Sequence, residues 1–224
     1  MMKINKEGYR IIAISGVCCT AIWALIYYML EVQESGWLLS MISLLLLLFW
    51  FFIVSFFREP RRVKIHDNHL VFSPCDGRVV VTELVRDDEY FGGEERMQIS
   101  IFMSVTNVHA NWFPVEGTVK KVVHHNGNFY KAWLPKASTE NERSTVVIET
   151  PEGHEVLVRQ VAGAVARRIV TYAREGEECN IDEHMGFIKF GSRVDVYLPI
   201  DKTEVLVHMG QKTVGNQTIV ARLK

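Results

Sequence analysis

Residues 144–158, with the sequence STVVIETPEGHEVLV, give the clearest indication of the fold. Two runs rich in β-branched residues flank the segment 150–153, whose proline and glycine are typical of a tight turn, so the stretch predicts a β-hairpin. Residues 193–198 alternate polar and apolar side chains, as a strand with one face on a core does. We therefore expect residues 65–224 to form a mainly β domain, a small sandwich or barrel with few short helices. Residues 104–112 are the candidate for one such helix.

Residues 1–64 differ in character from the rest of the chain. Residues 11–30 and 37–57 contain no charged side chain, and each reaches roughly 30 Å as a helix, the thickness of a hydrocarbon core. A short polar segment, residues 31–36, connects them. We predict an α-helical transmembrane hairpin with spans at about 11–30 and 37–57. A hairpin that enters only one leaflet is the alternative.

Basic side chains border both ends of the predicted hairpin, whereas its connecting segment carries two glutamates and no basic residue. Because positive charge near membrane spans favours the cytoplasmic side, we expect both termini and the β domain beneath the inner leaflet of the cell membrane. The basic residues are Lys3, Lys6, Arg10, Arg58, Arg61, Arg62 and Lys64. We expect the last four of them to lie at an anionic membrane surface.

Charge and cysteine content exclude two kinds of partner. Residues 65–224 carry a formal net charge of −4, so no broad basic face for nucleic acid is expected. The four cysteines form no CxxC pair. His124 and His125 are adjacent, so on a strand they would point to opposite faces, and no carboxylate cluster accompanies them. We therefore assign neither a nucleic-acid partner nor a metal site.

Four polar residues are candidates for chemistry, and each also has an ordinary structural explanation. Asp76 lies in a Pro-Cys-Asp-Gly turn, where aspartate is common. His109 stands among apolar residues, as a hydrogen-bonded structural histidine does. Arg143 is either a solvated loop charge or a planar fork for a phosphate or carboxylate. Ser192 follows Gly191 and opens the alternating strand, although a Gly-Ser pair alone has little meaning.

Five short segments carry motifs whose order and spacing are specific. They are SPCDG (73–77), IFMSVTNVHANWFP (101–114), NER (141–143), QVAGAVARRI (160–169) and GFIKFGS (186–192). The last segment resembles the G-x-F-x-[FL]-G-S cleavage motif of the phosphatidylserine decarboxylase proenzymes in their short form. The other four resemble motifs of the same family, and the likeness extends over roughly residues 60–224.

The resemblance implies a lyase that makes its own cofactor. Ser192 Oγ would attack the carbonyl of Gly191, the chain would split between residues 191 and 192, and Ser192 would become a pyruvoyl group. The pieces 1–191 and 192–224 would stay associated. The pyruvoyl ketone would form a Schiff base with the amine of phosphatidylserine in the membrane, and carbon dioxide and phosphatidylethanolamine would be released.

The resemblance also implies roles for the remaining candidates. His109 and Asp76 would act as acid or base, and Arg143 would bind the substrate. Longer members of the family carry a second histidine, linked with self-cleavage, where this chain has Trp112. Either His109 serves both steps or another group helps.

Two other readings of the function stay open at this stage. One is a membrane-tethered β-sandwich that binds a partner without catalysis, and the other is a decarboxylase of a related amine-bearing lipid. In each case the chain could form a homo-oligomer with copies of itself.

Overall fold

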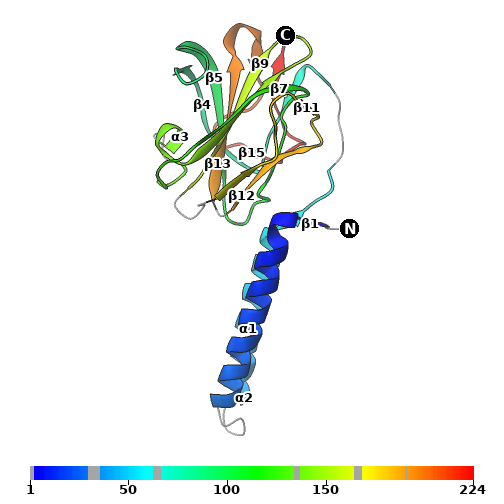
Figure 1. The fold of residues 1–224 in the computed structure, drawn as a ribbon, viewed down its shortest axis with the longest axis vertical. Coiled ribbons are helices and arrows are strands. Elements are labelled where there is room, and N and C mark those ends of the chain that lie inside the picture. The colour runs from blue at the N-terminus through cyan, green and yellow to red at the C-terminus, as the bar shows by residue number, and fades with distance from the viewer. Residues whose placement is uncertain (1–2, 30–35, 63–66, 134–136, 164–167, 190) are drawn as a thin grey trace. The chain divides into compact units, whose positions relative to one another are not determined.

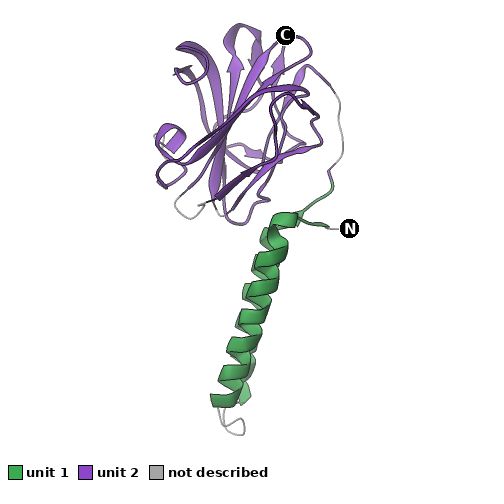
Figure 2. Ribbon diagram, in the orientation of Figure 1, with its two compact units in different colours: residues 1–61 green, residues 62–224 purple. Residues whose placement is uncertain are grey.

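The chain divides into two compact units, residues 1–61 and residues 62–224 (Figure 2). The computed structural model describes residues 3–29, 36–62, 67–133, 137–163, 168–189 and 191–224. The predicted connecting segment 31–36 lies outside the described residues except for Gly36, and so does Lys64.

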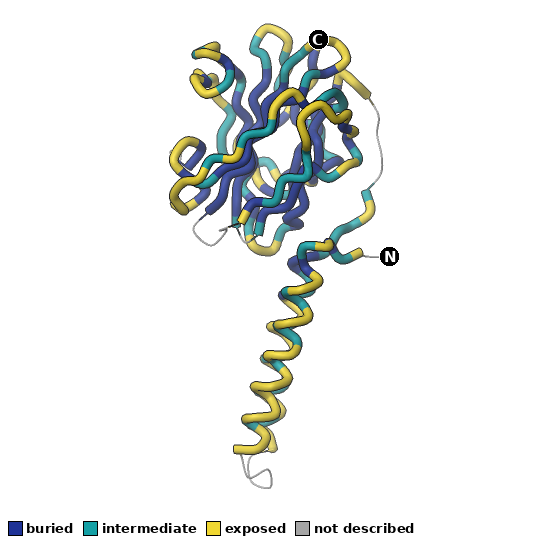
Figure 3. Tube along the Cα trace, in the orientation of Figure 1, coloured by how far each residue is buried: buried dark blue, intermediate teal, exposed yellow. Residues whose placement is uncertain are grey.

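The first unit is a helical hairpin. Helices α1 (Tyr9–Met29) and α2 (Gly36–Phe56) are each long and apolar enough to cross a membrane. Strand β1 (Lys3–Ile4) pairs antiparallel with β2 (Arg58–Glu59), and the 3-10 turn η1 (Lys6–Gly8) leads into α1. Most residues of the two helices are exposed or half-buried (Figure 3), and many of the exposed ones are large and apolar, which is the pattern of a helix that faces lipid.

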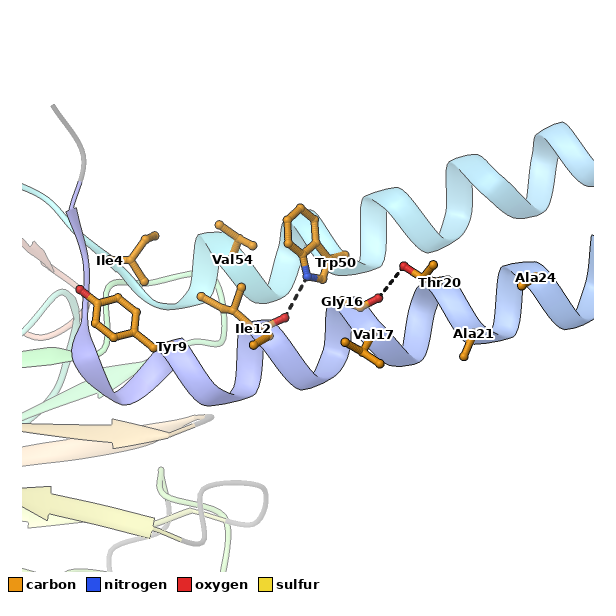
Figure 4. A pocket seen from close by; sticks show the side chains of 11 residues that line it. Ile4, Tyr9, Ile12, Gly16, Val17, Thr20, Ala21, Ala24, Trp50 and Val54 are labelled. Atoms are coloured by element: carbon orange, nitrogen blue, oxygen red, sulfur yellow. Dashed lines mark hydrogen bonds between the residues drawn. The ribbon is translucent and has the colours of Figure 1, made fainter.

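Two indole side chains join the helices of this hairpin. Trp50 Nε1 donates to the backbone carbonyl of Ile12 at 3.1 Å (Figure 4). Trp23 Nε1 donates to Ser43 Oγ at 2.8 Å. Because polar groups in hydrocarbon need partners inside the protein, these bonds favour pairing of the two helices. An apolar groove of about 770 Å³ lies beside Trp50 and follows Gly16 and its neighbours on α1 (Figure 4).

The second unit consists mainly of antiparallel strands, which form one curled eight-stranded sheet and two three-stranded sheets within the described residues (Figure 1). The large sheet has the order β11 (Glu178–Cys179), β7 (Gly117–His125), β8 (Arg143–Glu149), β9 (Glu155–Val161), β13 (Ser192–Pro199), β5 (Glu94–Met103), β4 (Gly77–Asp87) and β15 (Lys212–Thr213). One small sheet has the order β10 (Arg168–Thr171), β12 (His184–Lys189) and β6 (Ala110–Trp112). The other has the order β14 (Thr203–Val205), β16 (Ile219–Leu223) and β3 (Leu70–Phe72). Two short helical turns, α3 (Ala137–Glu140) and η2 (Ile200–Lys202), complete the unit.

The predicted fold class, a mainly β domain preceded by two apolar helices, is confirmed. The hairpin predicted for residues 144–158 is formed by β8 and β9, whose register runs from Arg143 opposite Val161 to Glu149 opposite Glu155. It succeeds as a prediction because both the alternation and the turn chemistry are local properties of the chain.

Strand β13 lies inside the large sheet, paired with β9 on one side and β5 on the other. Its first residue, Ser192, is opposite Met103 of β5. The side chains of β13 alternate between two faces, and those on both faces are buried (Figure 3). Val194, Val196 and Leu198 enter the main hydrophobic core, and Arg193, Asp195 and Tyr197 enter a polar layer on the other face.

Residues 104–112 do not form the predicted short helix. Residues 104–109 are a loop, and β6 begins at Ala110. Asn107 Oδ1 accepts both the backbone N–H of Ser104 at 2.9 Å and its hydroxyl at 2.7 Å. Such local bonds between side chain and backbone compete with a helical turn. The loop instead places His109 directly before Ala110, the first residue of β6.

Candidate active site

Ser192 is fully buried at the start of β13. Its Oγ has no hydrogen-bond partner among the residues that the structure describes. Buried hydroxyls usually have a partner, so an unpaired one calls for a functional explanation. The preceding Gly191 has φ +67°, a left-handed conformation that glycine adopts without steric cost. The chain therefore enters β13 through a bend suited to glycine, and a hydroxyl free of competing bonds follows it.

The imidazole of His109 lies beside this bend, although 82 residues separate it from Gly191 in the sequence. Gly191 N–H donates to Nε2 of His109, and the two nitrogens are 3.3 Å apart. On the other side of the ring, Nδ1 is 3.0 Å from the carbonyl oxygen of Asn107. Because a carbonyl oxygen can only accept, Nδ1 carries the proton and Nε2 keeps its lone pair toward Gly191.

The backbone also holds His109 in this position. Its carbonyl oxygen accepts the N–H of Ile188 on β12 at 3.2 Å, and its side chain is fully buried. A neutral imidazole with an unprotonated Nε2 is a general base, and a serine hydroxyl is a nucleophile once a base removes its proton. The arrangement can therefore perform nucleophilic chemistry at the carbonyl of Gly191.

Asp76 belongs to a different set of contacts. Its Oδ1 lies 2.7 Å from a terminal nitrogen of Arg62 and accepts the N–H of Gly215 at 2.9 Å. The guanidinium of Arg62 also donates to the carbonyl of Gly215 and lies 4.3 Å from the centre of the Trp112 ring. In the described part of the chain, these contacts of Asp76 do not include His109 or Ser192.

The position of Arg62 corrects one expectation. Its side chain is only 6% exposed, so Arg62 is an interior partner of Asp76 and not a residue of an anionic membrane surface. The sequence did not reveal this position. A short basic run predicts the membrane topology, but it does not distinguish a basic side chain that folds inward from one that stays at the surface.

Arg143 is engaged within the protein. Its guanidinium forms an ion pair with Glu89 and donates to the carbonyl of Thr139 at 2.5 Å. Glu89 also lies 2.8 Å from Arg159, which pairs with Asp87 at 2.9 Å. Carboxylates of the same chain thus compensate the charge of Arg143. Its role in binding the substrate stays a prediction.

The buried thiol of Cys75 has surroundings that suppress its reactivity. Burial raises the pKa of the Cys75 thiol well above its ordinary value, and the charge of the neighbouring Asp76 raises it further. The thiol is therefore protonated and a poor nucleophile. Within the described ranges, no three His, Cys, Asp or Glu side chains gather as a metal site would require.

The sequence pattern of a family described as phosphatidylserine decarboxylase matches residues 49–221 of the chain. This chain belongs to the phosphatidylserine decarboxylase family. It is 59% identical to the phosphatidylserine decarboxylase proenzyme of Bacteroides thetaiotaomicron and 57% identical to that of Phocaeicola vulgatus, in each case over all of this chain and 96% of the relative. It is 49% identical to a proenzyme of the same name from Porphyromonas gingivalis, over 99% of both chains.

Membership in the phosphatidylserine decarboxylase family confirms the resemblance inferred from the five motifs. The family is one of decarboxylases, and the two apolar helices fit association with a membrane. Of the candidate residues in the motifs, the structure brings together Ser192, Gly191 and His109, and it places Asp76 and Arg143 in other contacts.

Sequence reasoning missed one residue at this site, Asn107, whose carbonyl sets the protonation of the His109 ring. The spacing Ser104-x-x-Asn107 is a local signal for the turn that holds this loop, because asparagine side chains often bond to backbone N–H groups nearby. Nothing in the sequence indicates that the Asn107 carbonyl faces an imidazole.

Proposed function

We propose that the chain is a phosphatidylserine decarboxylase that activates itself by cleavage between Gly191 and Ser192. The observation that carries the proposal is the buried Ser192 Oγ, which has no hydrogen-bond partner among the described residues and directly follows a glycine whose N–H faces Nε2 of His109. A hydroxyl held free of other bonds, next to a base, is the setting that nucleophilic attack requires.

The self-cleavage follows from groups of this chain alone. As Ser192 Oγ attacks the carbonyl carbon of Gly191, His109 Nε2 releases the N–H of Gly191 and takes the hydroxyl proton. The C–N bond then breaks as this proton passes to the nitrogen of Ser192. The peptide bond is now an ester. Removal of the Cα proton of Ser192 then expels the carboxylate of Gly191 and leaves dehydroalanine. Water adds to its imine form and ammonia departs, so residue 192 ends as a pyruvoyl group.

The position of residue 192 suits such a group. A small keto cap at the first residue of β13 would replace a side chain that makes no hydrogen bond in the described structure, so no side-chain hydrogen bond is lost. The pyruvoyl ketone would take the amine of the substrate and act as the electron sink for loss of carbon dioxide. His109 contacts the neighbouring Gly191, and its imidazole is a group that could hold or return a proton at this point.

The two products of cleavage, 1–191 and 192–224, would stay associated. The smaller product supplies β13, which pairs with β9 and β5, and it also supplies β15 and β16. Removing these strands would open the middle of the large sheet. A cut before Ser192 breaks one covalent bond and leaves these pairings intact.

The helical hairpin would anchor the enzyme in the bilayer that contains its lipid substrate. Phosphatidylserine stays in the bilayer through its acyl chains, so an enzyme anchored by α1 and α2 meets the headgroup by a search in two dimensions. We place both chain ends and the β unit on the cytoplasmic side of the cell membrane, because basic residues flank both helices. Exposed Arg61 is one of the side chains available to anionic lipid.

The mass of the purified protein tests the proposal. The full chain, made in detergent, should yield a fragment of residues 192–224 that is lighter than its serine-ended form by the mass of ammonia. Ser192→Ala should stay whole, and Ser40→Ala, which removes a hydroxyl in α2, should be cleaved as the wild type is. Cleavage of the Ser192→Ala chain at the same place would refute the assignment.

The substrate needs a separate measurement. Vesicles that contain phosphatidylserine should release carbon dioxide with the wild-type protein and not with Ser192→Ala. Release from another amine-bearing lipid alone would assign a different headgroup. A wild-type chain that stays whole and inactive would indicate a binding module.

A further inference from the structure

The carbonyl oxygen of Gly191 lies directly against the backbone of Gly163, which follows strand β9. A Cβ atom added to Gly163 would lie 2.3 Å from this oxygen and 3.3 Å from the carbonyl carbon. Ordinary van der Waals contact begins at 3.4 Å, so the oxygen would have to move by about 1 Å to admit a side chain. Residue 163 must therefore be glycine for this carbonyl to keep its place.

Asn141 holds the segment that contains Gly163. Its Nδ2 donates to the carbonyl of Ala162 at 2.7 Å, and the N–H of Ala162 donates to the carbonyl of Glu142 at 2.9 Å. Asn141 is fully buried and also exchanges two hydrogen bonds with the backbone of Tyr130, at 2.8 and 2.9 Å. The side chain of Asn141 thus clamps two segments of chain, and one of them presses on Gly191.

Gly191 is consequently fixed at both of its backbone polar groups. Its N–H is bound by His109 Nε2, and its carbonyl oxygen is backed by Gly163. These two contacts keep the residue in its left-handed conformation, with φ +67°. The carbonyl carbon between them is the atom that Ser192 Oγ would attack.

We propose that Gly163, held by Asn141, is a positioning residue for self-cleavage, because it sets the orientation of the Gly191 carbonyl toward Ser192. The inference rests on the proposed self-processing. Nucleophile and carbonyl must meet at a defined distance and angle, and a misplacement of about 1 Å costs about 100-fold in rate. Asn141, the first residue of the NER segment, would then act on self-cleavage through Gly163, without touching the reacting atoms itself.

The test follows cleavage of newly synthesised full-length chain in detergent micelles over time. Gly163→Ala should be cleaved about 100-fold more slowly than the wild type. Gly117→Ala is the control, because its Cβ would meet the carbonyl oxygen of Glu149 at 2.1 Å at the start of β7, outside the site, and its φ of +153° adds backbone strain there. If Gly163→Ala is cleaved at the wild-type rate, or if both variants slow equally, the proposal is wrong.

Hydroxylamine separates positioning from a general loss of structure. It cleaves the ester between Gly191 and Ser192, so it should accelerate fragmentation of wild-type precursor. Folded Gly163→Ala, checked by its thermal transition, should fragment far more slowly with hydroxylamine than the wild type does, because its ester forms more slowly. Rapid cleavage of this variant by hydroxylamine would show that the ester forms without Gly163, and it would overturn the proposal.

A second variant decides the case in which Gly163→Ala does not fold. Asn141→Asp keeps the size of the side chain but turns an acceptor oxygen toward the carbonyls of Ala162 and Tyr130. It should slow cleavage at least 10-fold, and Asn180→Asp at an exposed turn should not. Wild-type rates for Asn141→Asp would refute the clamp. A wild-type chain that never cleaves would instead refute the self-processing itself.

Discussion

Replacing Asp76 with asparagine distinguishes a structural role of this carboxylate from a catalytic one. Asp76 Oδ1 lies 2.7 Å from a terminal nitrogen of Arg62, and the two side chains are 15% and 6% exposed. Asparagine keeps an oxygen for the N–H of Gly215, which now donates to Asp76 at 2.9 Å. It removes the negative charge, so the substitution leaves the guanidinium of Arg62 in the interior without a counter-charge.

The expected loss of stability follows from this geometry. Two unit charges at this distance attract each other by about 6 kcal/mol at an effective dielectric constant of about 20, and desolvation offsets part of it. Removing one member of a buried pair costs about 3–5 kcal/mol. Because Arg62 keeps its contacts with the Gly215 carbonyl and the Trp112 ring, we expect the lower end, about 3 kcal/mol. For a domain of this size, that lowers Tm by about 6–12 °C.

Thermal unfolding in detergent, followed by tryptophan fluorescence, measures the effect. Arg62→Gln with Asp76→Asn should lose less stability than the sum of the two single variants, because the pair is removed together. Asp201→Asn, an exposed carboxylate in η2, is the control and should change stability by no more than about 0.5 kcal/mol. If Asp76→Asn keeps the wild-type Tm but abolishes cleavage before Ser192, the carboxylate acts in the chemistry and the structural account is refuted.

Two further predictions concern a buried carboxylate in β13 and a buried thiol in β11. Asp195 lies 2.8 Å from Arg193, and both side chains are at most 1% exposed. Asp195→Leu alone should lower the free energy of unfolding, measured in urea, by about 3–5 kcal/mol, and adding Arg193→Met should restore most of that loss. Equal losses in the single and double variants would contradict this. Burial, with a smaller contribution from the charge of Glu183, raises the pKa of the Cys179 thiol to about 12. In a chain that carries Cys18→Ser and Cys19→Ser, iodoacetamide at pH 8 should therefore label Cys179 only after denaturation. Prompt labelling of the native protein, read by peptide mass, would disagree with that pKa.

Much of the fold is predictable because it is encoded locally. The apolar runs that become α1 and α2, and the alternation that becomes β8, β9 and β13, are periodic over a few residues. The helix expected at 104–112 fails for an equally local reason, since the Asn107 side chain takes the backbone N–H of Ser104. A side-chain bond of this kind changes the outcome without changing the hydrophobic pattern.

The site is less predictable because its parts meet only through tertiary pairing. The sequence shows Ser192 and His109 as separate residues, and only the family resemblance suggests that they act together. Their approach depends on β12, which pairs with β6 and carries the chain toward Gly191, and on the N–H of Ile188 bonded to His109. The inward turn of Arg62 likewise depends on Asp76, which the sequence places at a distance.

Trp112 stands where the longer members of the family carry a second histidine, so in the proposed self-cleavage His109 would act without it. Its ring packs under the guanidinium of Arg62 and against the His184 ring at 5.0 Å, and a Cβ on Gly215 would come within 2.9 Å of it. An aromatic side chain enclosed in this way stabilises the ion pair of Arg62 with Asp76 and offers no proton to the reaction. Among the described residues, His109 is then the imidazole in contact with Gly191. This arrangement favours His109 as the base in the proposed self-cleavage, and the contacts of Asp76 with Arg62 and Gly215 favour the structural role that Asp76→Asn tests.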